Sequence, residues 1–127
     1  MRYLLDTNVL CKLSHPRVRS WILQHQLQIA IASMTVAEIA QGVESLPQGK
    51  RRRQLEGFLS EIMDDYPVVP FDQTAALAWG NYVANAGRPL PVRDSIIAAT
   101  ALANNLEVVT GNTNDFVGVE TINPIKD

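Results

Sequence analysis

Short apolar segments alternate with amphipathic, helix-forming segments along this chain, and this alternation constrains the fold more than any other feature. The segments that read as strands are Arg2–Leu5, Ile29–Ala32, Pro67–Pro70, Leu106–Val109 and Val119–Ile122. Strands that alternate with helices favour a parallel sheet covered by helices on both faces. We therefore predict a three-layer α/β fold, with a mainly parallel central sheet of about five short strands flanked by helices.

Apolar periodicity and capping residues predict the helices between these strands. The expected helices run from Pro16 to about Leu27, from a cap within 33–35 to about Leu46, onward from the basic run 50–53, from the cap Asp72 to about Ala86, and over the apolar run 95–103. The last of these is apolar on nearly every side, so we expect it in the middle of the domain.

Length and composition predict one domain over residues 1–127. A chain of 127 residues with 46% hydrophobic residues can bury one core and leaves no room for a second. No apolar run has the length that a membrane span needs, and the first residues lack a signal-peptide pattern, so we expect a cytoplasmic protein. The single cysteine, Cys11, cannot form an internal disulfide, and we expect it to pack.

The net charge of -2 gives no bulk attraction to nucleic acid. The total can mislead, however. If four of the 13 acids shared one metal pocket, 11 basic residues would face 9 acidic ones, and two divalent ions would bring the total from -2 to +2. A nucleic-acid substrate therefore stays compatible with the composition.

Two acids follow the first two strands. Asp6 comes directly after the first strand, where α/β proteins place ligand sites, although an aspartate there is also a common helix N-cap. Glu38 falls in the first turn of the helix after the second strand, at the same sheet edge. It also fits a capping box with Thr35, in which the carboxylate serves only the local backbone. Sequence pattern alone leaves the two interpretations of Glu38 equally open.

Two further acids occur later in the chain. Asp94 stands just before the apolar helix, where it could compensate the helix dipole or bind a cation. Asp115 follows the fourth strand and, taken alone, is an ordinary loop acid. Carboxylates that converge at one sheet edge repel one another, so such a cluster makes physical sense around Mg²⁺, with Mn²⁺ possible. Such an ion could activate a water molecule against a phosphodiester.

The segments around these acids resemble the four motifs of the PIN-domain family, in the family's order, and in particular its VapC-type toxin ribonucleases. The segments are Tyr3–Leu10, Thr35–Ile39, Asp94–Ala101 and Thr110–Phe116, and the resemblance extends to about Ile125. It implies a catalytic, metal-binding quartet of Asp6, Glu38, Asp94 and Asp115. It also implies supporting polar groups at Asn8, Thr110 and Asn112. Relatives often carry arginine where Gly111 stands, so a phosphate contact made there could be missing or supplied from elsewhere.

The resemblance further implies a metal-dependent endoribonuclease that cuts a transfer-RNA or ribosomal-RNA loop. It implies a homodimer and a VapB-like antitoxin whose arginine approaches the acids. Arg93, beside Asp94, is the cation best placed to contact substrate, with a plain ion pair as the alternative. We expect the basic run Lys50–Arg53 to be a solvated helix surface. His15 and His25 lack the spacing of a zinc site, and we expect them at the surface.

Two other functions compete with the nuclease. A receiver or phosphatase domain also places acids at strand ends, but the third strand here ends in Val69-Pro70-Phe71-Asp72, and no lysine matches the one that a receiver needs. A catalytically silent PIN-like domain that only binds other proteins is the second alternative. The complete set of four acids argues against it.

Overall fold

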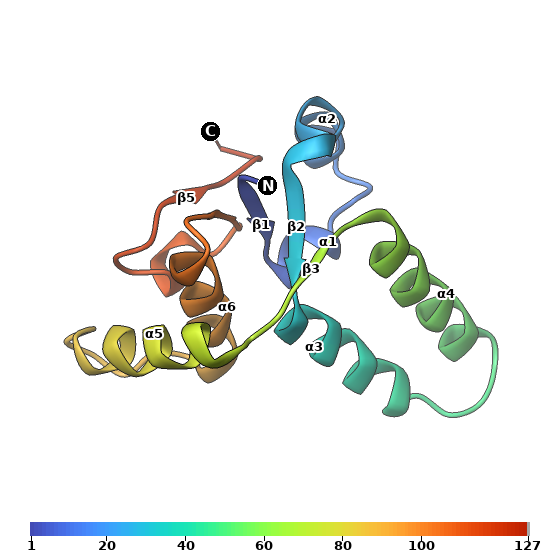
Figure 1. Cartoon of the computed structure of the whole chain (residues 1–127). Helices are drawn as coiled ribbons and strands as arrows, with labels where there is room; N and C mark the ends of the chain where they lie inside the picture. The colour runs from blue at the N-terminus through green and yellow to red at the C-terminus, as the bar shows by residue number, and fades with distance from the viewer. Residues whose placement is uncertain (127) are drawn as a thin grey trace.

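The computed structural model describes residues 1–126 and contains a five-stranded, fully parallel sheet (Figure 1). Its strands are β1 (Tyr3–Leu5), β2 (Ile29–Ala32), β3 (Val68–Val69), β4 (Glu107–Val109) and β5 (Thr121–Ile122). They pair in the order β3-β2-β1-β4-β5, with Leu5 opposite Ile31 on one side and Val109 on the other. The predicted α/β class and the predicted strands are confirmed. The strand β2 has the predicted bounds, and the other four strands are one or two residues shorter than predicted.

Helices cover the sheet on both faces. The helices are α1 (Thr7–Leu10), α2 (Pro16–His25), α3 (Ser33–Glu44), α4 (Lys50–Asp65), α5 (Gln73–Ala84) and α6 (Val92–Ala103), and short 3₁₀ turns η1 (Gln26–Gln28) and η2 (Thr113–Asp115) complete the fold. Figure 1 shows α4 and α6 on opposite sides of the strands. The helix predictions are therefore confirmed, with ends shifted by one to three residues.

The two faces of β1 feed two separate cores, because successive strand side chains point in opposite directions. Tyr3 and Leu5 pack in one core with apolar residues of α2, α3 and α4. Leu4 packs in the other core, with Val108 and with Ile97 of α6. Ile97 and its helix neighbours 98–101 are fully buried, which confirms that α6 lies in the middle of the molecule. One core therefore lies on each face of the sheet, between the strands and a layer of helices, which confirms the predicted three layers.

Some local expectations were wrong. The N-cap of α3 is Ala32 and not a residue of 33–35, and no side chain caps this helix. Cys11 is exposed rather than packed, and it is the C-cap of α1, which ends at Leu10. The expected surface position of His15 and His25 is not among them, since both are partly exposed: His15 caps α2, and the ring of His25 stacks on Trp21.

Within residues 1–126, no helix is both long enough and apolar enough to cross a membrane.

Candidate acidic site at the carboxyl ends of the strands

Asp6 anchors the site at the end of the central strand. From β1 the sheet extends through β2 and β3 on one side and through β4 and β5 on the other. The carboxyl ends of β1 and β4 therefore lie at the topological switch point, where α/β folds bind ligands. The Asp6 backbone amide donates to the carbonyl of Val109 at 2.9 Å, which joins the two strand ends. Only 3% of Asp6 is exposed. A buried carboxylate at this point needs donors.

Three donors converge on the Asp6 carboxylate. The Thr7 amide reaches Oδ1 at 2.8 Å, whereas Asn8 Nδ2 and the Thr110 hydroxyl both reach Oδ2 at 2.9 Å. Asp6 is therefore the N-cap of α1 and also part of a network that links α1 to β4. The two sequence interpretations of Asp6 are compatible. Burial nevertheless raises the pKa of Asp6, against the hydrogen bonds from Thr110 and Thr7 that lower it.

The predicted supporting residues hold the loop after β4 in place. Asn8 Oδ1 accepts a hydrogen bond from the Gly111 amide at 3.2 Å, and the Thr110 hydroxyl accepts one from the Asn112 amide at 2.9 Å. Asn8 and Thr110 therefore act on Asp6 and on this loop together. Asn112 contributes its backbone to the network, while its residue is exposed at the surface.

Glu38 points to the site and not to its own helix terminus. Its Oε1 accepts a hydrogen bond from the Thr7 hydroxyl at 2.9 Å. Because α3 begins at Ser33 with no capping side chain, Thr35 and Glu38 form no capping box. The hypothesis that Glu38 serves only the local backbone is therefore wrong. The Thr7 hydroxyl also donates to the Thr35 hydroxyl at 3.3 Å. Thr7 was not predicted as a site residue.

Arg93 forms the ion pair that was its alternative interpretation. Its Nη1 lies 3.8 Å from Glu38 Oε2, and its Nη2 donates to Gln41 Oε1 at 2.7 Å. The pair is longer than a hydrogen bond, and Arg93 is largely exposed, so it neutralises Glu38 only in part. The predicted contact with substrate stays a prediction.

Asp94 and Asp115 complete the set. Asp94 lies in the first turn of α6, and Asp115 ends η2. The pKa of Asp94 is raised to about 6, first by burial and then by the charges of Asp6, Asp115 and Glu38 and a hydrogen bond to Asp115. The charges of all three other acids thus act on the Asp94 carboxyl. The structure brings together all four predicted residues, which we call the acidic cluster.

The acidic cluster fits a hard divalent cation in its chemistry. Carboxylate oxygens are the ligands that Mg²⁺ and Mn²⁺ prefer, and an opposite charge would relieve the repulsion that raises the pKa of Asp94. Among residues 1–126, no three histidine, cysteine, aspartate or glutamate side chains lie close enough to enclose an ion without moving. Glu38 is turned toward Thr7 and Arg93, which is one reason for this open arrangement.

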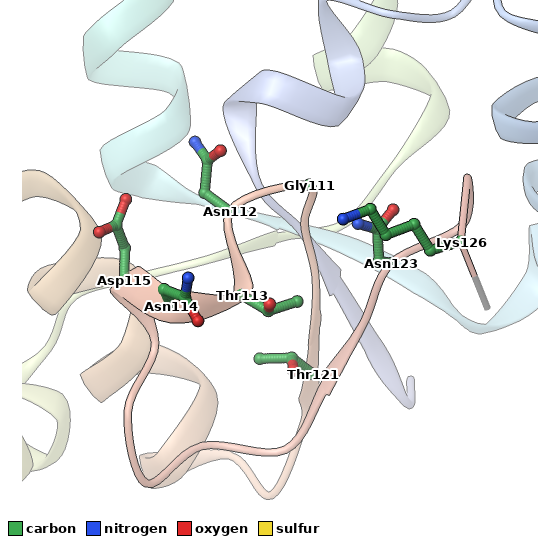
Figure 2. A pocket seen from close by; sticks show the side chains of 8 residues that line it. All are labelled: Gly111, Asn112, Thr113, Asn114, Asp115, Thr121, Asn123 and Lys126. Atoms are coloured by element: carbon green, nitrogen blue, oxygen red, sulfur yellow. The ribbon is translucent and has the colours of Figure 1, made fainter.

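A polar hollow of about 560 Å³ opens beside the acidic cluster (Figure 2). Residues 111–115 form one wall, and Thr121, Asn123 and Lys126 form the other. Figure 2 shows the Asp115 carboxylate at one end and Lys126 at the other. The lining offers hydroxyl, amide, carboxylate and ammonium groups, which suits a polar, charged ligand rather than an apolar one.

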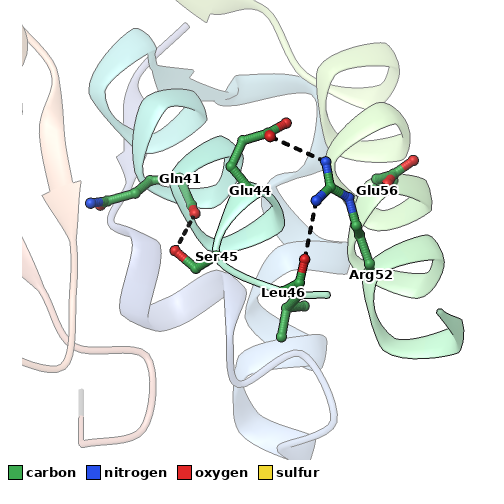
Figure 3. Close-up of polar contacts among 6 residues, drawn as sticks. All are labelled: Gln41, Glu44, Ser45, Leu46, Arg52 and Glu56. Carbon is green, nitrogen blue, oxygen red and sulfur yellow. Dashed lines mark hydrogen bonds and ion pairs between the residues drawn. The ribbon is translucent and has the colours of Figure 1, made fainter. Parts of the chain in front are cut away.

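One residue of the basic run at the start of α4, Arg52, has a structural role. Arg52 donates to Glu44 at 3.1 Å and to the carbonyl of Leu46 at 3.1 Å, and it pairs with Glu56 at 3.1 Å (Figure 3). These contacts join the end of α3 to α4. Lys50, Arg51 and Arg53 belong to the same helix, and the interpretation of the run as a solvated surface holds least for Arg52, whose side chain is 17% exposed.

Known proteins are similar to this chain over nearly its full length. The family model of the PIN domain matches residues 3–120. VapC ribonuclease Y4jK of Sinorhizobium fredii is 34% identical, over 94% of this chain and 95% of the relative. The tRNA(fMet)-specific endonuclease VapC of Shigella flexneri is 32% identical, over 91% and 90%. The crystal structure of FitAcB from Neisseria gonorrhoeae superposes with a TM-score of 0.85 at 30% identity, over 98% of this chain and 99% of that one.

Proposed function

Because this chain belongs to the PIN-domain family, we propose that it is a metal-dependent endoribonuclease and the toxin of a type II toxin–antitoxin pair. Relatives at 32–34% identity are named as a ribonuclease and as a tRNA-specific endonuclease. Their names support RNA as the substrate. We propose a transfer-RNA or ribosomal-RNA loop as the cleaved element. The same similarity supports hydrolysis of a phosphodiester bond as the reaction.

The convergence of the acidic cluster at the switch point carries this proposal. Asp6, Glu38, Asp94 and Asp115 come from four separate segments, and a purely structural fold has no need to crowd their charges together. We propose that these four carboxylates hold Mg²⁺, or Mn²⁺ in its place. Such an ion supplies Lewis-acid activation of water and neutralises charge that develops on the phosphodiester.

The residues of the chain have separate tasks in this scheme. Asp6 is held rigid by its three donors, so it is the fixed ligand of the cluster. Thr7 orients Glu38 from the opposite side. A cation at the cluster would stabilise the charged form of Asp94, because it would offset the burial and the neighbouring charges that raise the pKa of this carboxyl to about 6.

We also propose a VapB-like antitoxin, a homodimeric assembly and a cytoplasmic location. A toxin–antitoxin complex from Klebsiella pneumoniae, to which this chain is similar at 25% identity, supports the antitoxin partner. An antitoxin arginine near the acidic cluster would compete with the metal for the same carboxylates, which gives inhibition an electrostatic cause. Arg93 already approaches Glu38 in this way from within the chain.

Cleavage of total cellular RNA by the purified, antitoxin-free protein tests the proposal. We expect discrete fragments with Mg²⁺ or Mn²⁺ and none with EDTA. The variant Asp94→Asn should lose this cleavage, and Asp72→Asn should keep it, since Asp72 caps α5 away from the cluster. Intact RNA under every metal condition would favour the alternative of a silent protein-binding module. Equal cleavage by Asp94→Asn and the unaltered chain would refute the assignment of the cluster.

A further inference from the structure

Gly111 leaves a gap at the rim of the acidic cluster, and Lys12 fills it. Gly111 directly follows Thr110, whose hydroxyl binds Asp6. A Cβ atom placed on Gly111 would lie 3.6 Å from the Lys12 ammonium nitrogen and 3.8 Å from Asn8 Oδ1. The head of a lysine from the turn after α1 thus stands where a side chain at position 111 would extend.

The backbone does not require glycine at this position. The glycines with left-handed backbone angles are Gly49, Gly87 and Gly118, whereas Gly111 has an ordinary conformation. A single Cβ would also meet its neighbours at normal van der Waals distance. A long side chain at 111, however, would run into the Lys12 ammonium. The gap is therefore a place for the lysine head.

Lys12 is held in position but has no anionic partner. Its amide donates to the carbonyl of Val9, and its carbonyl accepts from the amide of His15, both at 3.0 Å, so the turn is fixed. Within residues 1–126 the Lys12 side chain forms no hydrogen bond or ion pair. Its side chain is exposed. Its position and freedom make it available to an incoming anion.

The other cations near the cluster are engaged. Arg93 is bound to Glu38 and Gln41, and Arg88 donates to the carbonyl of Asn114. Lys126 is the exception: it lines the same hollow as Gly111 and forms no ion pair in the part of the chain that the structure describes (Figure 2). Two uncommitted ammonium groups therefore flank Gly111, from the turn after α1 and from the end of the chain.

We infer that Lys12 binds a backbone phosphate of the RNA strand at Gly111. The acidic cluster repels a polyanion, so the strand needs cations at the rim to bring its next phosphate close. Lys12 meets this need because its ammonium group lies against Gly111, the residue that follows the Asp6 donor Thr110. This assignment rests on the proposed ribonuclease function and names a substrate-positioning residue for it.

The test measures RNA binding in the cleavage-deficient Asp94→Asn protein, in buffer with Mg²⁺, by the anisotropy of a fluorescein-labelled single-stranded RNA of mixed sequence. Lys12→Met keeps the length of the side chain and removes its charge. We expect about three- to tenfold weaker binding and a salt dependence whose slope is smaller by about 0.7. The matched control is Lys50→Met, another exposed lysine at the start of α4, which should bind as tightly as the parent. Thermal unfolding should show that both variants stay folded.

A charge transfer makes the test specific for this location. Adding Gly111→Lys to Lys12→Met returns an ammonium group to the same gap from the other side, and we expect it to restore most of the lost affinity. Unchanged binding and salt slope in Lys12→Met, or failure of Gly111→Lys to restore binding in a folded protein, would overturn the inference while leaving the ribonuclease proposal intact. Absence of RNA binding by the Asp94→Asn parent, together with no cleavage by the unaltered chain, would overturn both.

Discussion

Replacing Asp94 by Asn should stabilise the metal-free protein while it abolishes cleavage. Burial and the other acids raise the pKa of Asp94 from 3.8 to about 6, so the charged form is disfavoured in the folded state. A rise of roughly two pH units corresponds to about 3 kcal/mol, and solvent screening at this half-exposed carboxyl reduces the figure to about 1–2 kcal/mol. Asparagine has the shape of the protonated acid without its charge. At pH 8 the free energy of unfolding of the variant should therefore exceed that of the unaltered protein by about this amount.

The pH dependence gives this prediction its sign. A neutral Asp94 carboxyl costs nothing, so the folded state is favoured below the unfolded pKa of about 3.9, and this contribution is lost as the pH rises through about 6. The gain from Asp94→Asn should thus be near zero at pH 4 and complete above pH 7. Urea unfolding in EDTA at both pH values measures it, with Asp72→Asn as the control that changes neither stability nor cleavage. A variant less stable than the parent at pH 8 would refute the argument from repulsion.

Three further positions are tested, two at the acidic cluster and one between α3 and α4. Thr7→Val removes the hydroxyl that orients Glu38, and we expect roughly tenfold lower cleavage, with Thr7→Ser close to the parent, in a metal-dependent RNA assay. Thr110→Val deprives buried Asp6 of a donor and should lower the free energy of unfolding by about 1–3 kcal/mol in urea. Arg52→Ala breaks the contacts between α3 and α4 and should cost about 1 kcal/mol of stability, yet leave cleavage unchanged; reduced cleavage in the folded variant would contradict a purely structural role.

The sequence could predict most of the fold because local patterns decide most of it. Short apolar strands and capped helices alternate, and a parallel sheet follows from that alternation. The position of Asp6 followed from the same rule, since the residue after the central strand must emerge at the carboxyl edge. The supporting donors Asn8 and Thr110 came with the resemblance to the PIN-domain family, and both reach Asp6.

Other features depend on contacts between distant segments, which local patterns do not encode. The spacing of Thr35 and Glu38 is the same in a capping box and in a site, and only the approach of Thr7 from another element distinguishes them. Thr7 was itself hidden, because a threonine after an N-cap aspartate is an ordinary first helical residue. The place of Lys12 was unpredictable for the same reason: its partner position, Gly111, is distant in sequence and has no side chain to suggest a contact.

The fold handles the crowded acids in three different ways. Three hydrogen bonds to Asp6 oppose the effect of its burial, and Glu38 shares a loose ion pair with Arg93. Asp94 instead holds a proton up to a pH of about 6 and is hydrogen bonded to Asp115. A cation at the cluster would make the second and third arrangements unnecessary but would leave the first intact. Below about pH 6 it would therefore have to displace the Asp94 proton, so the affinity of the site for a metal should fall with the pH in that range.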